Sequence, residues 1–325
     1  SSGRILDHMR PHRRARRSAR AWLTLSIVGL AALGCASAPP PAQTAALPGA
    51  ADTQAPKAIT PSTVSSSETP AALGHEVIDH HVHLLGPALI QDWKSLGITF
   101  SRPDSTYLSP AGLLAPVADG AEAPPAAIGR VVLVPMGHLY ANSEMREGLG
   151  LSLEQERAKV QGENDHVARE AARWPGRALA LCSVNPLRPY AWEELERCRD
   201  ELRVAGIKVH VANNEIDLRE PEHLAALAKL AGWAEAEEMP LLLHLDPQRR
   251  GHTTEHITAF AEAVFGPHPK LQVIIAHLGG SGGYAAWTQS VFRTLLDWLD
   301  AREASGDTRL GVYFDLSAAY LERES

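Results

Sequence analysis

Histidine residues at the ends of apolar segments are the groups of this chain that could carry out chemistry. The first such segment, Val77 to Leu85, contains His81 and His83, with Asp79 two residues before them. Side chains alternate along a β-strand, so these three residues share one face. Two neutral imidazoles on one face can bind a divalent cation together, and Zn²⁺ is commonly held in this way. A single pair is a weak signal, because histidines without a ligand role occur at the same spacing.

Two later apolar segments place a histidine at an equivalent point. His244 follows three consecutive leucines, and His277 follows the run Val273 to Ala276. Strands of a parallel sheet that are buried on both faces are expected to be continuously apolar. Histidines at three strand ends are therefore unexpected as core residues. The carboxyl ends of barrel strands meet at one mouth, so we expect these imidazoles to converge on one cation.

The segment Gly206 to Val211 adds a lysine and a histidine on one face. Lys208 would be costly in a buried strand unless it is neutral, paired or chemically modified. Lys208 could instead pair with a carboxylate for structural reasons, and His210 could lie at the rim of the site without a role. The sequence alone leaves both these interpretations and a functional role open.

Apolar segments alternate with segments whose apolar residues recur at helical spacing. The predicted strands are Val77–Leu85, Ile128–Pro135, Ala178–Val184, Gly206–Val211, Pro240–Leu245, Leu271–Ala276 and Leu310–Leu316. The predicted helices are Leu153–Arg173, Tyr190–Val204, Pro221–Glu238, Thr253–Phe265 and Tyr284–Ala304. This alternation predicts an α/β fold with a parallel sheet. Seven strands in series, without a glycine-rich phosphate loop after the first, favour a TIM-like (β/α)8 barrel.

An eighth strand is absent from this series. An incomplete barrel exposes the edges of its first and seventh strands, which invites association. We therefore expect either a shortened gene product or a gap that another segment or subunit fills, as in a homo-oligomer. Residues 86–127 are rich in Pro, Gly and Ala and are expected to form the first functional loop at the barrel mouth.

Taken together, these motifs resemble the amidohydrolase superfamily, in particular its amidohydrolase-2, decarboxylase-related branch. The resemblance rests on Asp79-x-His81-x-His83, on His244, on IIAHLGG at 274–280, on ENDHVAREAARWPGRALALCSVNP at 163–186 and on GIKVH at 206–210. It covers roughly residues 75–318, with the motifs in the order that the family shows.

The resemblance implies a metal centre in which His81, His83 and His244 are the ligands. Zn²⁺ is the favoured divalent ion, with Mn²⁺ and Fe²⁺ as alternatives. The resemblance also implies that His277 is the acid–base residue beside the metal, or a ligand of a second metal. Lys208 matches a position that bridges two metals in some relatives, and it could equally bind a substrate carboxylate.

Two aspartates belong to the expected site. We expect Asp79 to orient a ligand histidine from the second layer around the metal rather than to bind the metal itself. The resemblance implies a metal-binding aspartate at the end of an eighth strand, beyond the last residue of this chain. Asp315 matches the motif of the seventh strand instead.

The expected chemistry is that of a metal-activated water. Binding to the metal lowers the pKa of water toward about 7 and supplies hydroxide at neutral pH. We expect hydrolysis of a C–N or C–O bond (an amide, ester or lactone) in a small-molecule substrate, with His277 moving a proton. One alternative keeps the site and removes CO₂ from an aromatic or unsaturated acid. Another is a non-catalytic, tethered binding protein with a degenerate barrel.

The N-terminal residues indicate export. Arginines crowd residues 10–20, an apolar run spans residues 21–33, and a glycine and Cys35 follow, which is typical of a secretory signal peptide. A cysteine at the end of the apolar run favours a lipoprotein signal over residues 1–35, in which Cys35 carries the lipid. Residues 1–8 are interpreted as a tag remnant or an over-extended start before Met9.

Residues 36–73 are dominated by Ala, Pro, Thr and Ser and are expected to form a disordered linker to a domain at 74–325. The predicted location is therefore a bacterial membrane, to which a lipid anchor holds the chain on the periplasmic or cell-surface side. The net charge of −7 and the isoelectric point of about 6.1 give no basic face of the kind that nucleic acids require.

The other cysteines and several histidines are expected to have no role in the site. A lone pair of cysteines in a large domain does not indicate a disulfide framework, so we expect Cys182 and Cys198 to be buried or partly buried free thiols. His138, just after the second predicted strand, is expected at the surface, with a place lining the mouth as the alternative. His252, His256 and His268 are expected in solvent.

Overall fold

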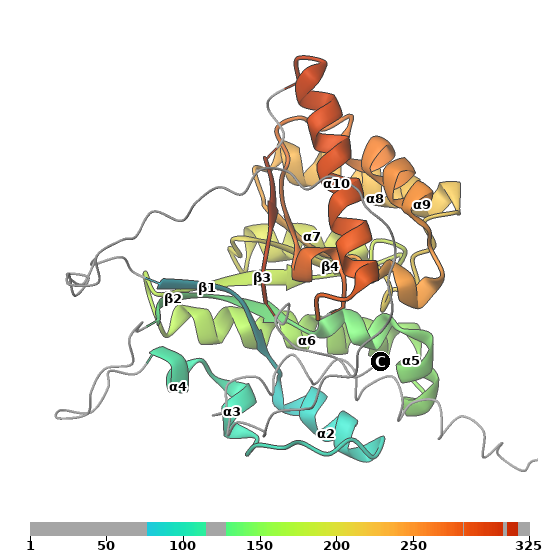
Figure 1. The fold of residues 1–325 in the computed structure, drawn as a ribbon. Coiled ribbons are helices and arrows are strands. Elements are labelled where there is room, and N and C mark those ends of the chain that lie inside the picture. Colours follow the sequence, from blue (N-terminus) through green and yellow to red (C-terminus); the bar gives the residue numbers. More distant parts are fainter. Residues whose placement is uncertain (1–76, 115–127, 282, 308–310, 318–325) are drawn as a thin grey trace, which may run out of the picture.

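The computed structural model describes residues 77–114, 128–281, 283–307 and 311–317 (Figure 1). The predicted signal peptide with Cys35 and the predicted linker at 36–73 lie outside these ranges. In the described part of the chain, no helix is both long and apolar enough to cross a bilayer.

Seven parallel strands form one sheet in which each strand pairs with the next along the chain. They are β1 (Val77–Leu84), β2 (Ile128–Pro135), β3 (Ala178–Ser183), β4 (Gly206–His210), β5 (Leu241–His244), β6 (Gln272–Ile275) and β7 (Gly311–Phe314). A sheet that winds in one direction without reversing is that of a (β/α) barrel rather than that of a doubly wound dinucleotide fold. The prediction of an α/β, TIM-like barrel is confirmed, and the described residues contain seven of its strands.

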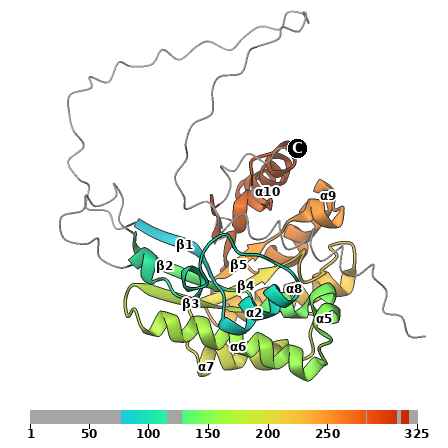
Figure 2. The same cartoon turned by 90° about the horizontal axis from the view of Figure 1, so that it is seen from below.

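Helices connect successive strands and cover the outer side of the sheet. They are α5 (Ser143–Leu149), α6 (Leu153–Ala172), α7 (Ala191–Asp200), α8 (Pro221–Ala236), α9 (Thr254–Phe260) and α10 (Ala286–Ala304). Figure 2 shows the strands as a fan with α6 and α7 along its outer side. The sequence predicts the start of α6 well, because Ser152 and Gln155 form a capping box that satisfies backbone N–H groups at the helix start.

The segment after β1 contains more regular structure than we expected from its composition. Three short helices lie there: α2 (Pro87–Ser95), α3 (Ser105–Leu108) and α4 (Ala111–Leu114). Proline suits the first position of α2, since that residue has no helical N–H partner to lose. Leu89, Ile90 and Trp93 are buried, so apolar packing stabilises α2 in a segment that we predicted as a loop.

Successive strand residues face two different layers of the core. Ile207 and Val209 pack outward against the helices, whereas Leu242 packs in a small cluster inside the barrel. Lys208 lies between the two outward residues and is in register with Leu242. The side chain of Lys208 is therefore directed into the barrel, as is that of His210, which is in register with His244.

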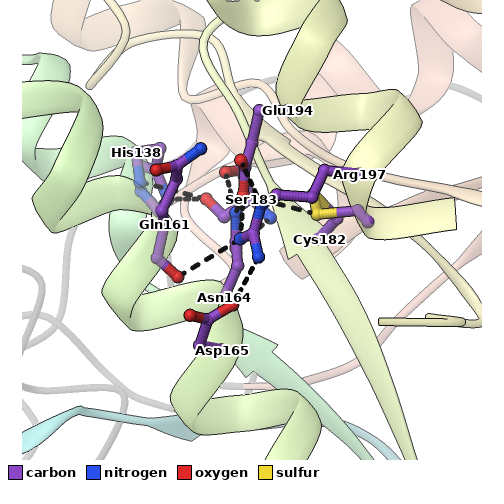
Figure 3. Close-up of a disulfide and its surroundings, with 9 residues drawn as sticks. His138, Gln161, Asn164, Asp165, Cys182, Ser183, Glu194 and Arg197 are labelled. Carbon is purple, nitrogen blue, oxygen red and sulfur yellow. Dashed lines mark hydrogen bonds and ion pairs between the residues drawn. A yellow bond between two sulfur atoms is a disulfide. The ribbon is translucent and has the colours of Figure 1, made fainter. Parts of the chain in front are cut away.

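A disulfide joins β3 to α7, because Cys182 and Cys198 are bonded with a Cα–Cα distance of 6.1 Å (Figure 3). The expectation of two free thiols is wrong. Both residues are fully buried, and they meet because α7 folds back over the strand that precedes it. Sequence spacing could not reveal this contact, since it depends on how the helix lies on the sheet.

Buried polar groups surround the disulfide and hold the end of β3 in place (Figure 3). The Asn164 side chain accepts a hydrogen bond from the backbone N–H of Ser183 at 2.9 Å and donates to Glu194 at 2.7 Å. Arg197 pairs with Glu194 at 2.8 Å. The carboxylate of Glu194 is thus both paired and hydrogen-bonded, as a buried charge requires. The network connects α6 and α7 to the strand end at Ser183.

Candidate metal centre

His81 and His83 bring their imidazoles together at the end of β1. Their Nε2 atoms are 3.1 Å apart, and their ring centroids are 4.7 Å apart. Two nitrogens that each bind one Zn²⁺ at about 2.0–2.1 Å lie about 3 Å from each other when their bonds are nearly perpendicular. The adjacent His80 is exposed. It therefore points away from the side on which His81 and His83 lie, as the predicted alternation of side chains along the strand requires.

The tautomer of His81 leaves Nε2 available as a ligand. Its Nδ1 lies 2.8 Å from an Asp315 carboxylate oxygen. An ionised carboxylate only accepts hydrogen bonds, so Nδ1 carries the proton and Nε2 keeps its lone pair. A carboxylate behind a histidine in this way orients the ring and raises its basicity toward a metal.

Asp315 organises both sides of the site from the end of β7. One carboxylate oxygen accepts hydrogen bonds from the backbone N–H groups of His277 at 2.9 Å and of Ser317 at 3.0 Å, and the hydroxyl of Ser317 donates to it as well. Burial raises the pKa of Asp315, but the hydrogen bond from His81 and the nearby imidazoles outweigh burial and lower it. Asp315 is therefore ionised at neutral pH.

His277 lies just after β6 in an unusual backbone conformation. Both His277 and Leu278 have positive φ angles, of 53° and 55°, which costs about 1–2 kcal/mol for each non-glycine residue. The hydrogen bond from the His277 N–H to Asp315 offsets part of this cost, as does one from the Leu278 N–H to the Asp315 carbonyl at 3.2 Å. Strained backbone of this kind is often found at functional sites.

The side chain of His277 is held in one tautomer. Its Nδ1 donates to the carbonyl oxygen of Ser317 at 2.5 Å, so in the neutral ring Nε2 carries the lone pair. The ring stacks on His81 with a centroid distance of 4.9 Å and meets His244 edge-on at 4.6 Å. His277 thus lies between the pair on β1 and the histidine on β5.

Two ring nitrogens at this centre have no hydrogen-bond partner among the described residues. They are Nε2 of His244 and Nδ1 of His83, and both are buried. A buried polar atom without a partner costs about 1–3 kcal/mol. A cation that accepts the lone pair of His244 would remove that cost. The ligand atoms of His81, His277 and Asp315 lie within 4.8 Å of one another, and the ring of His244 meets that of His277. Donors of these types suit a divalent metal.

Burial keeps the imidazoles in the neutral form that binds metals. It lowers the pKa of His81 to about 3, with the charge of Lys208 acting in the same direction. It also lowers the pKa of His83 and of His244 well below the usual value. Lys208 is fully buried, and burial lowers its pKa to about 7, although Asp315 opposes the shift.

A groove gives small molecules access to the centre. It lies between β1 and β7 and has a volume of about 1360 Å³. His81, His83 and Asp315 line it together with Ser317. The side chains that could bind a metal are therefore accessible to a small molecule from solvent, although the two imidazole rings are largely buried.

A family model described as Amidohydrolase matches residues 78–322. The chain belongs to this family. The match spans β1 through β7 and includes all four histidines of the centre, so the resemblance inferred from the motifs is confirmed.

The chain is also similar to two curated proteins, both gamma-resorcylate decarboxylases. One is from Rhizobium radiobacter and the other from Rhizobium sp. (strain MTP-10005). Each is 28% identical over 148 residues, which cover 38% of this chain and 45% of the relative. The chain thus spans less than half the length of the curated relatives it matches.

Solved structures with a similar fold include further decarboxylases. A 2,6-dihydroxybenzoate decarboxylase from Rhizobium is 22% identical with a TM-score of 0.40, and the match covers 63% of this chain and 67% of that chain. A 5-carboxyvanillate decarboxylase from Novosphingobium aromaticivorans DSM 12444, complexed with manganese, is 16% identical with a TM-score of 0.45 and 71% coverage of each chain. At these scores, the fold assignment rests on the strand order of the chain itself.

The structure brings most of the expected site residues together. His81 contacts both His83 and His277, and His244 touches His277. Lys208 lies beside them, with its Nζ atom 3.4 Å from Nε2 of His81.

The aspartate that contacts the ring of His81 is Asp315 and not the expected Asp79. Asp79 accepts a hydrogen bond from the backbone N–H of His81 at 3.0 Å. The sequence did contain a signal for Asp315, namely an acidic residue directly after an apolar strand.

Two histidines lie in other surroundings than predicted. The placement of His138 at the surface is wrong, because it is fully buried beside the strand ends. His252 is also buried, and its Nε2 accepts a hydrogen bond from the backbone N–H of Leu218 at 3.0 Å. His256 and His268 are half-buried. Loops that fold back over the barrel cover these rings, and periodicity in the sequence does not predict such loops.

Proposed function

We propose that this chain is a metal-dependent enzyme that removes CO₂ from an aromatic or unsaturated carboxylic acid without oxidation. The observation that carries the proposal is the 28% identity to two gamma-resorcylate decarboxylases, in a chain with a buried cluster of neutral histidines. Hydrolysis of a C–N or C–O bond, our first expectation, has less support, because the relatives named above are decarboxylases.

The proposed cation ligands are Nε2 of His81, of His83 and of His244. A divalent ion at this position supplies positive charge that stabilises negative charge developing on substrate oxygens. Three imidazoles suit Zn²⁺, and Mn²⁺ is an alternative that also binds nitrogen and oxygen ligands. The buried Asp315 carboxylate keeps the first of these rings in the tautomer that the cation needs.

His277 is the proposed proton carrier. In decarboxylation, the bond between the carboxylate and its carbon breaks, CO₂ leaves, and the electron pair stays on that carbon. The carbon then takes up a proton, which a positioned side chain can supply. The hydrogen bond from Nδ1 of His277 to the Ser317 carbonyl leaves the lone pair on Nε2, so Nε2 is the atom that would take up a proton from solvent and pass it to the carbon.

A direct assay tests the proposal. The purified chain would be loaded separately with Zn²⁺ and Mn²⁺, its metal content measured by elemental analysis, and a panel of hydroxybenzoates incubated with it. We expect about one cation per site and CO₂ release from at least one carboxylate, without oxygen from labelled water entering the product. Ester, amide or lactone cleavage without CO₂ release would instead establish hydrolysis. Metal binding without turnover of the hydroxybenzoates or of esters, amides and lactones would support the non-catalytic alternative.

We also propose that the chain is exported and anchored through lipid on Cys35. The arginine-rich start, the apolar run and the cysteine at its end support this location. The buried Cys182–Cys198 disulfide supports it as well, because such bonds form and persist in oxidising compartments. Expression with a labelled fatty acid would test the anchor: the wild-type chain should carry the label and C35A should not. Equal labelling of both chains would exclude lipid attachment at this cysteine.

A further inference from the structure

Two buried histidines at the mouth of the barrel have no role in the proposed metal centre. His210 is the last residue of β4, and His138 lies in a short 3₁₀ helix (Gly137–Ala141) directly after β2. Their ring centroids are 5.4 Å apart, and the ring of His210 stacks on that of His244 at 3.8 Å. Both rings are therefore packed against the centre rather than against solvent.

The hydrogen bonds of His210 determine which of its nitrogens carries the proton. Its Nδ1 accepts a hydrogen bond from the backbone N–H of Asn213 at 3.3 Å. A neutral imidazole has one donor and one acceptor nitrogen, so the proton of His210 is on Nε2. That atom is a hydrogen-bond donor and has no lone pair for a metal.

The same reasoning applies to His138. The hydroxyl oxygen of Ser183 accepts the backbone N–H of His138 at 3.1 Å and lies 2.8 Å from its Nδ1. The hydroxyl hydrogen of Ser183 has no other acceptor among the described residues, so it is donated to Nδ1. The ring proton of His138 is therefore on Nε2, which is buried without a partner in the described part of the chain.

Lys208 adds a third donor between these rings and the metal centre. It precedes His210 by two residues on β4, so both side chains are directed into the barrel, and its Nζ atom lies 3.4 Å from Nε2 of His81. Asp315, the carboxylate that acts on the amine, already accepts the hydrogen bonds from His81, His277 and Ser317 described above.

We propose that His138, His210 and Lys208 form an anion-binding subsite that receives the carboxylate of the substrate. The proposal rests on the proposed function and names what that function leaves open, namely how the substrate is held. A carboxylate bound there would accept hydrogen bonds from the two histidine N–H groups and from the lysine amine. Its negative charge would be balanced by the positive charge of the lysine. On the other side of Lys208 lies His81, whose Nε2 is 3.4 Å from the Lys208 Nζ atom and is one of the proposed metal ligands.

Binding of benzoate, a simple aromatic carboxylate, tests the subsite without turnover. The metal-loaded chain would be titrated with benzoate by calorimetry, with benzamide as the uncharged comparison. H138F and H210F remove the donor and keep a ring of similar size, whereas H138Q and H210Q restore an N–H donor. H80F is the matched control, since His80 is exposed on the neighbouring strand. Circular dichroism and elemental analysis on every variant would report folding and metal content.

We expect benzoate to bind the wild-type chain more tightly than benzamide. Each Phe variant should lose about tenfold or more in benzoate affinity, because a hydrogen bond to a charged group is lost. Each Gln variant should recover part of that loss, and metal content should stay at the wild-type value in all of them.

Three results would overturn the subsite. The first is equal affinity of the wild type for benzoate and benzamide. The second is an unchanged affinity for benzoate in the folded Phe variants. The third is loss of metal from the Phe variants, which would show that these histidines are metal ligands. Failure of the proposed function gives a different result, in which the wild-type chain binds no metal or releases no CO₂. The affinities of the wild type and its variants for benzoate and benzamide can still be compared in that case.

Discussion

The ring of His81 and the carboxylate of Asp315 are joined by a 2.8 Å hydrogen bond across 234 residues of sequence. This contact links the first and the last described strands of the sheet at the metal centre. It also decides the chemistry of the ring, since the proton on Nδ1 leaves Nε2 to bind a cation. The proposed metal centre would therefore depend on β7 being in place, although its proposed ligands come from β1 and β5.

Removing the charge of Asp315 should weaken metal binding while leaving the ligands intact. We expect D315N to bind Zn²⁺ about 10- to 100-fold more weakly, as is typical when the partner of a ligand histidine is changed. Competition with a fluorescent chelator would measure this. D79N is the matched control, because Asp79 contacts only the backbone of His81, and it should retain nearly full affinity. Equal losses in the two variants would argue against orientation by Asp315.

Each proposed ligand should be needed for the metal. H81A, H83A and H244A should each lose most of the bound metal after dialysis, measured by elemental analysis of the folded protein. H80A should keep it, because that side chain is exposed on the same strand. A variant that kept the wild-type metal content would remove its residue from the ligand set.

Loss of the disulfide should destabilise the fold. Closing a loop of about 15 residues stabilises a protein by about 3 kcal/mol through the entropy of the unfolded chain, and Cys182 and Cys198 are separated by 16 residues. C198A should therefore unfold at lower urea concentration than the wild type. Adding a reductant should destabilise the wild type and have little effect on the variant. Two additional free thiols in the denatured, unreduced wild type would show that the bond is absent.

The buried histidines should make the metal-free protein sensitive to acid. The folded-state pKa values of His81 and His138 are lowered to about 3 from the ordinary 6.5. Between those values the unfolded state binds more protons, so the stability that each neutral ring contributes is present above pH 6.5 and is lost as the pH falls toward 3. At pH 5 each ring should account for about 2 kcal/mol. Urea titrations from pH 7 to pH 4 would measure the loss, and H138F should reduce it.

Lys208 should produce a second dependence on the alkaline side. Burial lowers its pKa to about 7 from 10.5, so the unfolded state binds more protons between these values and stability should rise with pH across that range. K208M should be more stable than the wild type at pH 7 and should lack most of this rise. A wild type whose stability is flat from pH 7 to 10 would contradict a buried, readily deprotonated lysine.

Much of the fold could be predicted because its signals are local. Each strand is an apolar run that ends within a few residues of its predicted end, as at β4, predicted to Val211 and observed to His210. The start of α6 was predictable for the same reason, since a capping box involves residues three positions apart. The short helices after β1 were not predictable in this way, because packing of Trp93 and its neighbours forms them rather than a strong local pattern.

The site divides in a similar way between local pattern and distant contact. Histidines that interrupt apolar strands were visible in the sequence, and parallel strands bring such ends to one mouth. The proton positions on those rings were not visible, since they depend on partners from other elements, such as Ser183 for His138 and Asn213 for His210.

The sequence by itself determined the order of strands and helices and the family, because these follow from periodicity and from residue type, and it indicated the side chains that we propose to hold a cation. Tertiary structure decided which nitrogen of each histidine is free to act, that Asp315 rather than Asp79 contacts the ring of His81, and that Cys182 meets Cys198. A hydrogen bond or a disulfide requires two groups within a few ångströms, and only the packing of helices on the curved sheet brings groups that are distant in the chain to such separations.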